Sequence, residues 1–148
     1  GFDGKVYKQE VGKTFNGMTI PFEYNTAELM FDDPGIRNEI QRVILNLDQE
    51  GITKLVMRIK YNFNDDDYPQ PREYIISEGT DLAVFGSAVF GTSMFASPPT
   101  GFIRQPVEGS GFTAALTFTN DSSVSDENSS DPFTIKGFQI EHVRAGRR

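Results

Sequence analysis

The chain has 148 residues, a formal net charge of −7, a single histidine and no cysteine. This length suits one domain with one core. The missing cysteines exclude disulfides and thiolate chemistry, and one histidine excludes a multi-histidine metal site within the chain. The acidic balance argues against nucleic-acid binding, which needs an excess of Lys and Arg. No apolar run approaches the roughly 20 residues of a membrane-spanning helix.

Fourteen Gly and eight Pro imply many turns and favour an all-β architecture. Residues 1–17 are predicted to form an entry strand or linker, with a short strand or turn at Lys5–Lys8 and a tight turn at Asn16-Gly17. Residues 18–148 are predicted to form a single domain. Its first segment, Met18–Phe31, alternates apolar and polar residues, and its second half suits either another short strand or a continuation after a bend.

The segment from Asp32 to Gly51 fits two patterns. Ile36, Ile40, Val43, Ile44 and Leu47 fit one face of a helix, with Asp33 as a cap and Pro34 at the first position. Val43, Leu45 and Leu47 also fit an alternating strand. We expect a helical turn at about residues 34–39 followed by a strand, with a single helix as the alternative.

The run from Leu55 to Phe63 alternates cleanly with basic residues and predicts a strand, paired in a hairpin with the preceding run through Asp48–Gly51. Further strands are predicted at Arg72–Ile76, Asp81–Phe85 and Phe112–Thr119, and Gly101–Pro106 suits either a strand or an extended loop. A loop is predicted at Asn62–Pro71 and a solvated hairpin loop at Asn120–Asp131.

The closing stretch, Phe133–Arg148, is predicted to be a strand. Phe133 and Ile135 alternate with polar residues, and Phe138 and Ile140 continue on a phase that slips by one at Lys136-Gly137. A glycine at such a slip is typical of a β-bulge. Seven to nine strands separated by turns predict an antiparallel β-sandwich or jelly-roll-like fold, with at most one short helix or helical turn near residues 34–40.

Two sets of residues are candidates for binding in the region between residues 61 and 74. Asp65, Asp66 and Asp67 supply hard oxygen ligands for a metal, although they lack the spacing of an EF-hand loop and suit a solvated turn equally well. Tyr61, Tyr68 and Tyr74 offer rings for stacking a sugar in a chain without Trp. We expect no bound metal or other cofactor.

The closing strand and one loop carry the candidate interface residues. His142 continues the phase of Phe138 and Ile140, and nothing in the sequence places a nucleophile beside it, so we expect a packing or interface role and no catalysis. Arg144, Arg147 and Arg148 form a basic end that suits either a solvated terminus or contacts with a neighbour's carboxylates. Phe90, Met94 and Phe95 stand among small residues and suit either core packing or an interface.

Short motifs stand at both ends of the chain. The opening motifs Asp3-Gly-Lys-Val-Tyr-Lys-Gln-Glu-x-Gly12 and Phe15-Asn-Gly-x-x-Ile20 resemble a strand, and the chain that leaves it, in structural proteins of tailed-bacteriophage tails. The closing Phe133-x-Ile-x-Gly-x-x-Ile-Glu-His-Val-x-x-Gly-Arg-Arg148 is similar to their C-terminal signature, in which an aromatic residue often stands at the place of His142. Asp33-Pro-Gly-Ile-Arg37 resembles a loop that precedes a strand hairpin in the family.

This resemblance implies a non-enzymatic structural module of a phage tail, located in the virion. Its expected partners are further copies of the same chain in a homo-oligomer and other virion proteins. The alternative is a carbohydrate-binding or receptor-binding module whose partner is a host surface glycan.

Overall fold

The computed structural model describes residues 14–15, 18–31, 33–49, 53–78, 101–120 and 133–147. These residues form eleven strands and one short 3₁₀ turn, η1, at Asn62–Asn64. The strands are β1 Thr14–Phe15, β2 Met18–Thr19, β3 Glu23–Asn25, β4 Leu29–Met30, β5 Ile36–Gln49, β6 Thr53–Tyr61, β7 Tyr74–Glu78, β8 Phe102–Pro106, β9 Ser110–Gly111, β10 Thr113–Asn120 and β11 Phe133–Arg147.

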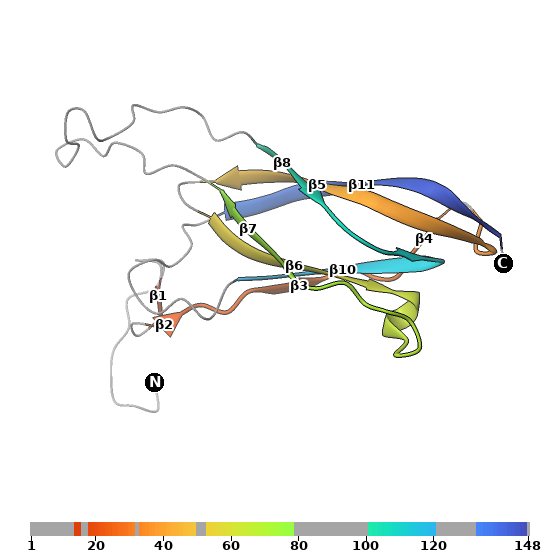
Figure 1. Ribbon diagram of the computed structural model, residues 1–148. Coiled ribbons are helices and arrows are strands. Elements are labelled where there is room, and N and C mark those ends of the chain that lie inside the picture. The colour runs from red at the N-terminus through yellow and green to blue at the C-terminus, as the bar shows by residue number, and fades with distance from the viewer. Residues whose placement is uncertain are drawn as a thin grey trace.

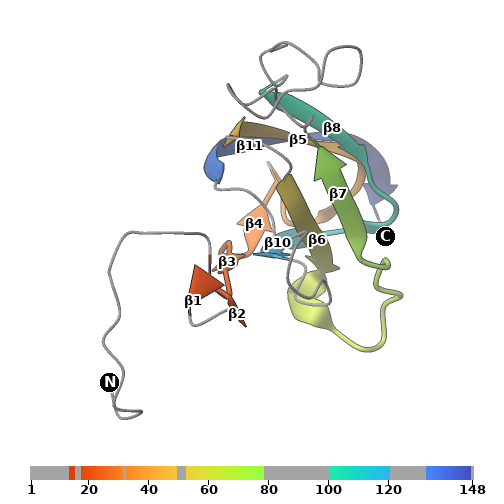
Figure 2. The same ribbon diagram turned by 90° about the vertical axis from the view of Figure 1, so that its left-hand side faces the viewer.

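Two antiparallel sheets pack face to face and confirm the predicted β-sandwich (Figure 1). One sheet has the order β3-β10-β6-β7, with β4 also paired to β10, and is called the β6–β10 sheet below. The other has the order β11-β5-β8, with β9 also paired to β5, and is called the β5–β11 sheet. β1 and β2 form a separate two-stranded sheet that lies to one side of the sandwich (Figure 2).

The core lies between the two sheets, where alternate residues of each strand point inward. β6 buries every second side chain from Thr53 to Tyr61, and Ala114, Leu116 and Phe118 of β10 are fully buried opposite them. The β5–β11 sheet contributes a second set of buried residues, which are Ile40, Val43, Leu45, Leu47 and Ile103. The β11 residues that pack against this core are only half-buried, because β11 lies at the edge of its sheet.

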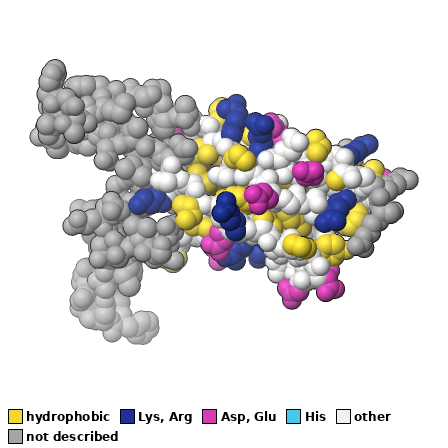
Figure 3. Space-filling view, viewed as in Figure 1, with side chains coloured by type: hydrophobic (Ala, Val, Ile, Leu, Met, Phe, Trp, Pro, Cys, Tyr) yellow, Lys and Arg dark blue, Asp and Glu magenta, His cyan; other side chains and the backbone are white. Residues whose placement is uncertain are grey.

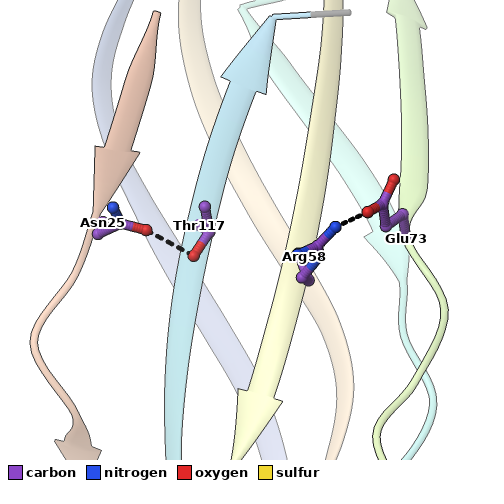
Figure 4. Close-up of polar contacts among 4 residues, drawn as sticks. All are labelled: Asn25, Arg58, Glu73 and Thr117. Atoms are coloured by element: carbon purple, nitrogen blue, oxygen red, sulfur yellow. Dashed lines mark hydrogen bonds and ion pairs between the residues drawn. The ribbon is translucent and has the colours of Figure 1, made fainter. Parts of the chain in front are cut away.

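The outer face of the β6–β10 sheet carries polar cross-strand contacts (Figure 4). The Thr117 hydroxyl donates to Oδ1 of Asn25 at 2.7 Å, directly across the β10–β3 ladder. Arg58 of β6 forms an ion pair with Glu73, just before β7. The outward side chains of β6 and β10 are therefore largely polar and the inward ones apolar, which is the alternation that predicted these strands from the sequence.

The helical turn predicted for about residues 34–39 is wrong, and so is the alternative of a single helix. Asp33 instead heads a tight turn in which its carbonyl accepts the Ile36 N–H at 3.0 Å and its Oδ1 accepts the Gly35 N–H at 2.8 Å. This second bond is the one that a helix cap makes, but here the chain continues as an extended strand from Ile36. The strand of the first alternative is confirmed, and it begins earlier than predicted.

Two predicted hairpins are also wrong. β5 does not pair with β6, because β5 belongs to one sheet and β6 to the other. β10 and β11 are likewise in different sheets, so the segment between them connects the two layers. Leu47 and Leu55, on either side of the β5–β6 connection, both face the common core. A chain that crosses between sheets therefore keeps the same alternation as a hairpin.

The bulge predicted at Lys136-Gly137 is confirmed. Ile135 pairs with Leu47 and Gly137 with Asn46, so Lys136 is the extra residue on β11. Two further register shifts leave Gln41 of β5 and Ala145 of β11 without a partner in this ladder. The predicted turn at Asn16-Gly17 and the predicted strands at Lys5–Lys8 and Asp81–Phe85 lie outside the described residues.

Candidate functional site

The tyrosines at the two ends of the predicted ligand region are structural. Tyr61 has 1% of its surface exposed, and its hydroxyl donates to the Glu108 carbonyl at 3.1 Å. The Tyr74 hydroxyl accepts the Glu108 N–H at 2.8 Å. The Tyr61 ring packs so closely on Gly109 that a Cβ there would lie 2.6 Å from Cε2. The two tyrosines therefore hold the β8–β9 connection against β6 and β7. Burial raises the pKa of Tyr61 above its ordinary value.

The loop after β6 begins with an unusual backbone. Asn62, Phe63 and Asn64 all have positive φ angles, of 53°, 58° and 60°. Asn tolerates this region, but for Phe63 it is strained. The Gln70 side chain stabilises the turn, because its Oε1 accepts the Tyr61 N–H at 2.8 Å and its Nε2 donates to the Tyr61 carbonyl at 3.1 Å. Phe63 was expected to continue the alternation of β6, but it is 68% exposed.

Tyr68 is half-buried and lies beneath the guanidinium of Arg37, whose Cζ is 5.8 Å from the ring centroid. Arg37 also donates to the Ser110 carbonyl at 3.2 Å. This cation–π contact joins the loop to β5 and occupies one side of the ring. The three tyrosines therefore do not form an open stacking platform in this structure.

The three aspartates lie in an exposed turn. Asp65 Oδ1 accepts the Asp67 N–H at 3.0 Å, and the Asp65 carbonyl accepts the Tyr68 N–H at 3.1 Å. Asp66 is exposed between them. Within the described residues, no three His, Cys, Asp or Glu side chains are grouped so that they could hold a metal ion.

His142 lies at the edge of the sandwich. Its ring contacts Phe31, with 4.6 Å between ring centroids, and its Nδ1 lies 3.1 Å from Oδ1 of the buried Asn38. Asn38 Nδ2 donates to the Ile36 carbonyl at 3.0 Å, which turns Oδ1 toward the histidine. Because an amide oxygen only accepts, His142 donates from Nδ1. The histidine thus fastens β11 to β5 at the point where the Gln41 bulge changes the register.

The structure describes only some of the remaining interface candidates. Arg144 lies opposite Asn38 in the β5–β11 ladder, and Arg147 lies opposite Ile36. β11 continues to Arg147, so the basic end is part of a strand. Arg148, Phe90, Met94 and Phe95 lie outside the described residues.

The β5–β11 sheet is basic although the protein is acidic. Its strands β5, β8, β9 and β11 contain six Lys or Arg and three Asp or Glu, a formal charge of +3. The whole chain carries −7, so the other residues together carry −10. Figure 3 shows Lys and Arg side chains along the upper rim, over β5 and β8, and acidic side chains at the lower right, where the loop after β6 lies.

A hollow on the outer face of the β5–β11 sheet was not predicted from the sequence. It has a volume of about 410 Å³ and is lined by Ile44, Asn46, Phe102, Arg104, Gly137, Phe138 and Gln139. The sequence did single out Gly137, but as the mark of a bulge. The hollow requires three strands to be in register, and β8 is distant from the other two in sequence.

No protein-family model, curated protein or solved structure matches this chain. Among the described residues, the structure contains no helix with the length and apolar character that a membrane span requires.

Proposed function

We propose that this chain is a non-enzymatic structural module of a bacteriophage tail that joins neighbouring subunits of a homo-oligomer in the virion. The resemblance of both chain ends to tail proteins suggests the class. The observation that carries the assembly role is the basic β5–β11 sheet, with a charge of +3, on a chain of −7. A second copy of the chain is the occupant that this charge pattern favours.

The proposed contact is between copies of the chain. The basic end of β11 in one copy meets acidic loops of the next, among which Asp65–Asp67 is exposed. Two different surfaces then meet, and such a heterologous contact closes into a ring when its rotation allows. Arginine suits this role because it binds carboxylates in a bidentate manner.

The edge of β11 fits contact through side chains better than addition of a further strand. β11 has 15 residues, and no described strand pairs with its outer edge. Its extra residues Lys136 and Ala145 interrupt the ladder. Bulges and charges on an edge oppose indiscriminate strand pairing, so the edge is open to a specific neighbour without being a flat template for aggregation.

Sedimentation velocity over a range of protein concentrations tests this assembly. We expect oligomers at about 0.01 M salt that dissociate at about 1 M, because the Debye length falls from about 30 Å to about 3 Å. The double variant Arg144→Glu, Arg147→Glu should dissociate at low salt. The control Lys54→Glu, Lys60→Glu makes the same charge change on the outer face of the other sheet and should remain assembled.

A chain that is monomeric at every concentration and salt level would refute the assembly role, as would equal effects of the two double variants. The tail assignment is tested separately by mass spectrometry of purified tail particles, which should contain the chain.

The alternative, a carbohydrate-binding module built on Tyr61, Tyr68 and Tyr74, has little support at that place. Tyr61 and Tyr74 are buried with their hydroxyls bonded to Glu108, and Arg37 lies over Tyr68.

A further inference from the structure

The hollow on the outer face of the β5–β11 sheet is built from two neighbouring rows of residues. The strand register aligns Phe102 of β8, Asn46 of β5 and Gly137 of β11 in one row. Arg104, Ile44 and Gln139 form the next row across the same three strands. The volume of about 410 Å³ falls within the range of small-molecule sites, which is roughly 300–1,000 Å³.

Gly137 leaves this space open, although its backbone conformation does not require glycine. The described glycines with positive φ are Gly109 and Gly146, and Gly137 is not among them. A Cβ built on Gly137 would meet no atom within 4 Å. Glycine in a strand interior often marks a bulge or a place where a ligand or another backbone approaches closely. Here Lys136 is the extra residue of the bulge and Gly137 has no positive φ, so the room that Gly137 leaves on the sheet supports the second reading.

The rim combines an aromatic face with planar polar groups. Phe102 is 60% exposed, although it belongs to a strand whose neighbour Ile103 is buried. Among the described residues, no side-chain hydrogen bond or ion pair involves Asn46, Gln139 or Arg104. A planar amide donates and accepts at once, so it suits neighbouring hydroxyls of a sugar ring, while an aromatic face packs against the C–H face of such a ring.

The positive charge of Arg104 favours a ligand that carries a carboxylate. The two flanking cations on this face are already paired, Lys136 with Asp48 at 2.9 Å and Arg42 with Glu141 at 2.8 Å. Arg104 is the charged residue that lines the hollow itself. A guanidinium binds a carboxylate through two parallel hydrogen bonds.

We infer that the hollow over Gly137 binds a saccharide ring that carries a carboxylate. Phe102 stacks on the ring, Asn46 and Gln139 bind its hydroxyls, and Arg104 pairs with its carboxylate. The site lies apart from the basic end of β11, because Gln139 and Arg144 are five residues, or about 17 Å, apart along the strand. It does not depend on the proposed assembly, so a monomer suffices to test it.

The test is a titration of the ¹⁵N-labelled chain with D-glucuronic acid, followed by amide chemical shifts, with D-glucose as the matched neutral probe. We expect shifts at the residues that line the hollow, and at least about tenfold weaker binding of glucose because it lacks the charge-assisted bonds. Arg104→Gln should lower glucuronate affinity about tenfold and leave glucose affinity unchanged. Phe102→Ala should weaken both.

Gly137→Leu should abolish binding by filling the hollow, and a dispersed spectrum will show that this variant folds. Phe63→Ala removes an aromatic residue of similar exposure beside the tyrosine loop and should bind as the natural chain does. Several results would overturn the inference: no shifts with glucuronate, shifts centred on Phe63 and Tyr68, equal binding of the two sugars, or undiminished binding by Gly137→Leu. Oligomers that form normally in the Gly137→Leu variant would separate this site from the assembly contact.

Discussion

The ladder between β6 and β10 is regular, whereas the ladder between β5 and β11 is interrupted by register shifts. β6 and β10 pair through seven consecutive residue pairs without a register shift. β5 and β11 pair through thirteen, interrupted by three shifts. The first ladder has a further strand on each side, whereas β11 has no described partner on its outer edge.

The difference shows that extra residues are tolerated in the edge ladder and not in the buried one. An extra residue between β6 and β10 would move fully buried side chains out of the core. At the edge, each extra residue redirects the side chains that follow it. After Lys136, Gly137 and Gln139 line the outer hollow, and after the register shift at Gln41, His142 meets Asn38. Both proposed contacts of this protein use the irregular ladder.

The largest expected effect is a cavity in the regular ladder. Leu116 has no exposed surface, so Leu116→Ala should lower the free energy of unfolding by about 2–5 kcal/mol. Ile140→Ala on the half-buried edge strand should lower the free energy of unfolding by about 1–2 kcal/mol, because Ile140 buries less apolar surface on folding than Leu116 does. Urea unfolding of the two variants measures both values. Equal costs would show that the edge strand is as much a part of the core as β10.

The glycines sharpen the same contrast. Gly109→Ala should lower the free energy of unfolding by about 1–3 kcal/mol, because φ is +105° and the new methyl group would lie 2.6 Å from the Tyr61 ring. Gly137→Ala should be neutral or stabilise by up to about 1 kcal/mol, since it restricts the unfolded chain and meets nothing in the folded one. Thermal and urea unfolding of both variants give the comparison. A destabilised Gly137→Ala would mean that the strand needs glycine for its backbone.

Alternation of apolar and polar residues was enough to predict β6, β10, β11 and the all-β fold, because a half-buried sheet face repeats every two residues. It was also enough for the Lys136 bulge, where the phase slips beside a glycine. The Gln41 bulge had the opposite effect. It separates Ile40 from Val43 by three residues, so Ile36, Ile40, Val43 and Leu47 acquired the spacing of a helix face.

Strand pairing and the hollow could not be predicted in the same way. A strand faces the core whether its partner is the next strand in sequence or one far away, so alternation did not reveal that β5 pairs with β11 and β8. The hollow depends on Phe102 and Arg104 lying opposite Asn46 and Ile44, which is a matter of register between distant segments. The burial of Tyr61 and Tyr74 could not be predicted either, because buried and exposed tyrosines look alike in sequence.

Alkaline pH tests the burial of the Tyr61 hydroxyl, at the end of β6. Burial raises the pKa of Tyr61, while the unfolded chain releases this proton near pH 10. The stabilisation is therefore complete below about pH 10 and is lost as pH rises above it, by about 1.4 kcal/mol per pH unit. Tyr61→Phe should be about 1 kcal/mol less stable at pH 8, where it lacks the hydrogen bond to Glu108. Since it cannot ionise, its free energy of unfolding should fall less steeply, and urea titrations at pH 8, 10 and 11 should show the two curves converging. Parallel curves would mean that the Tyr61 hydroxyl reaches water in the folded chain.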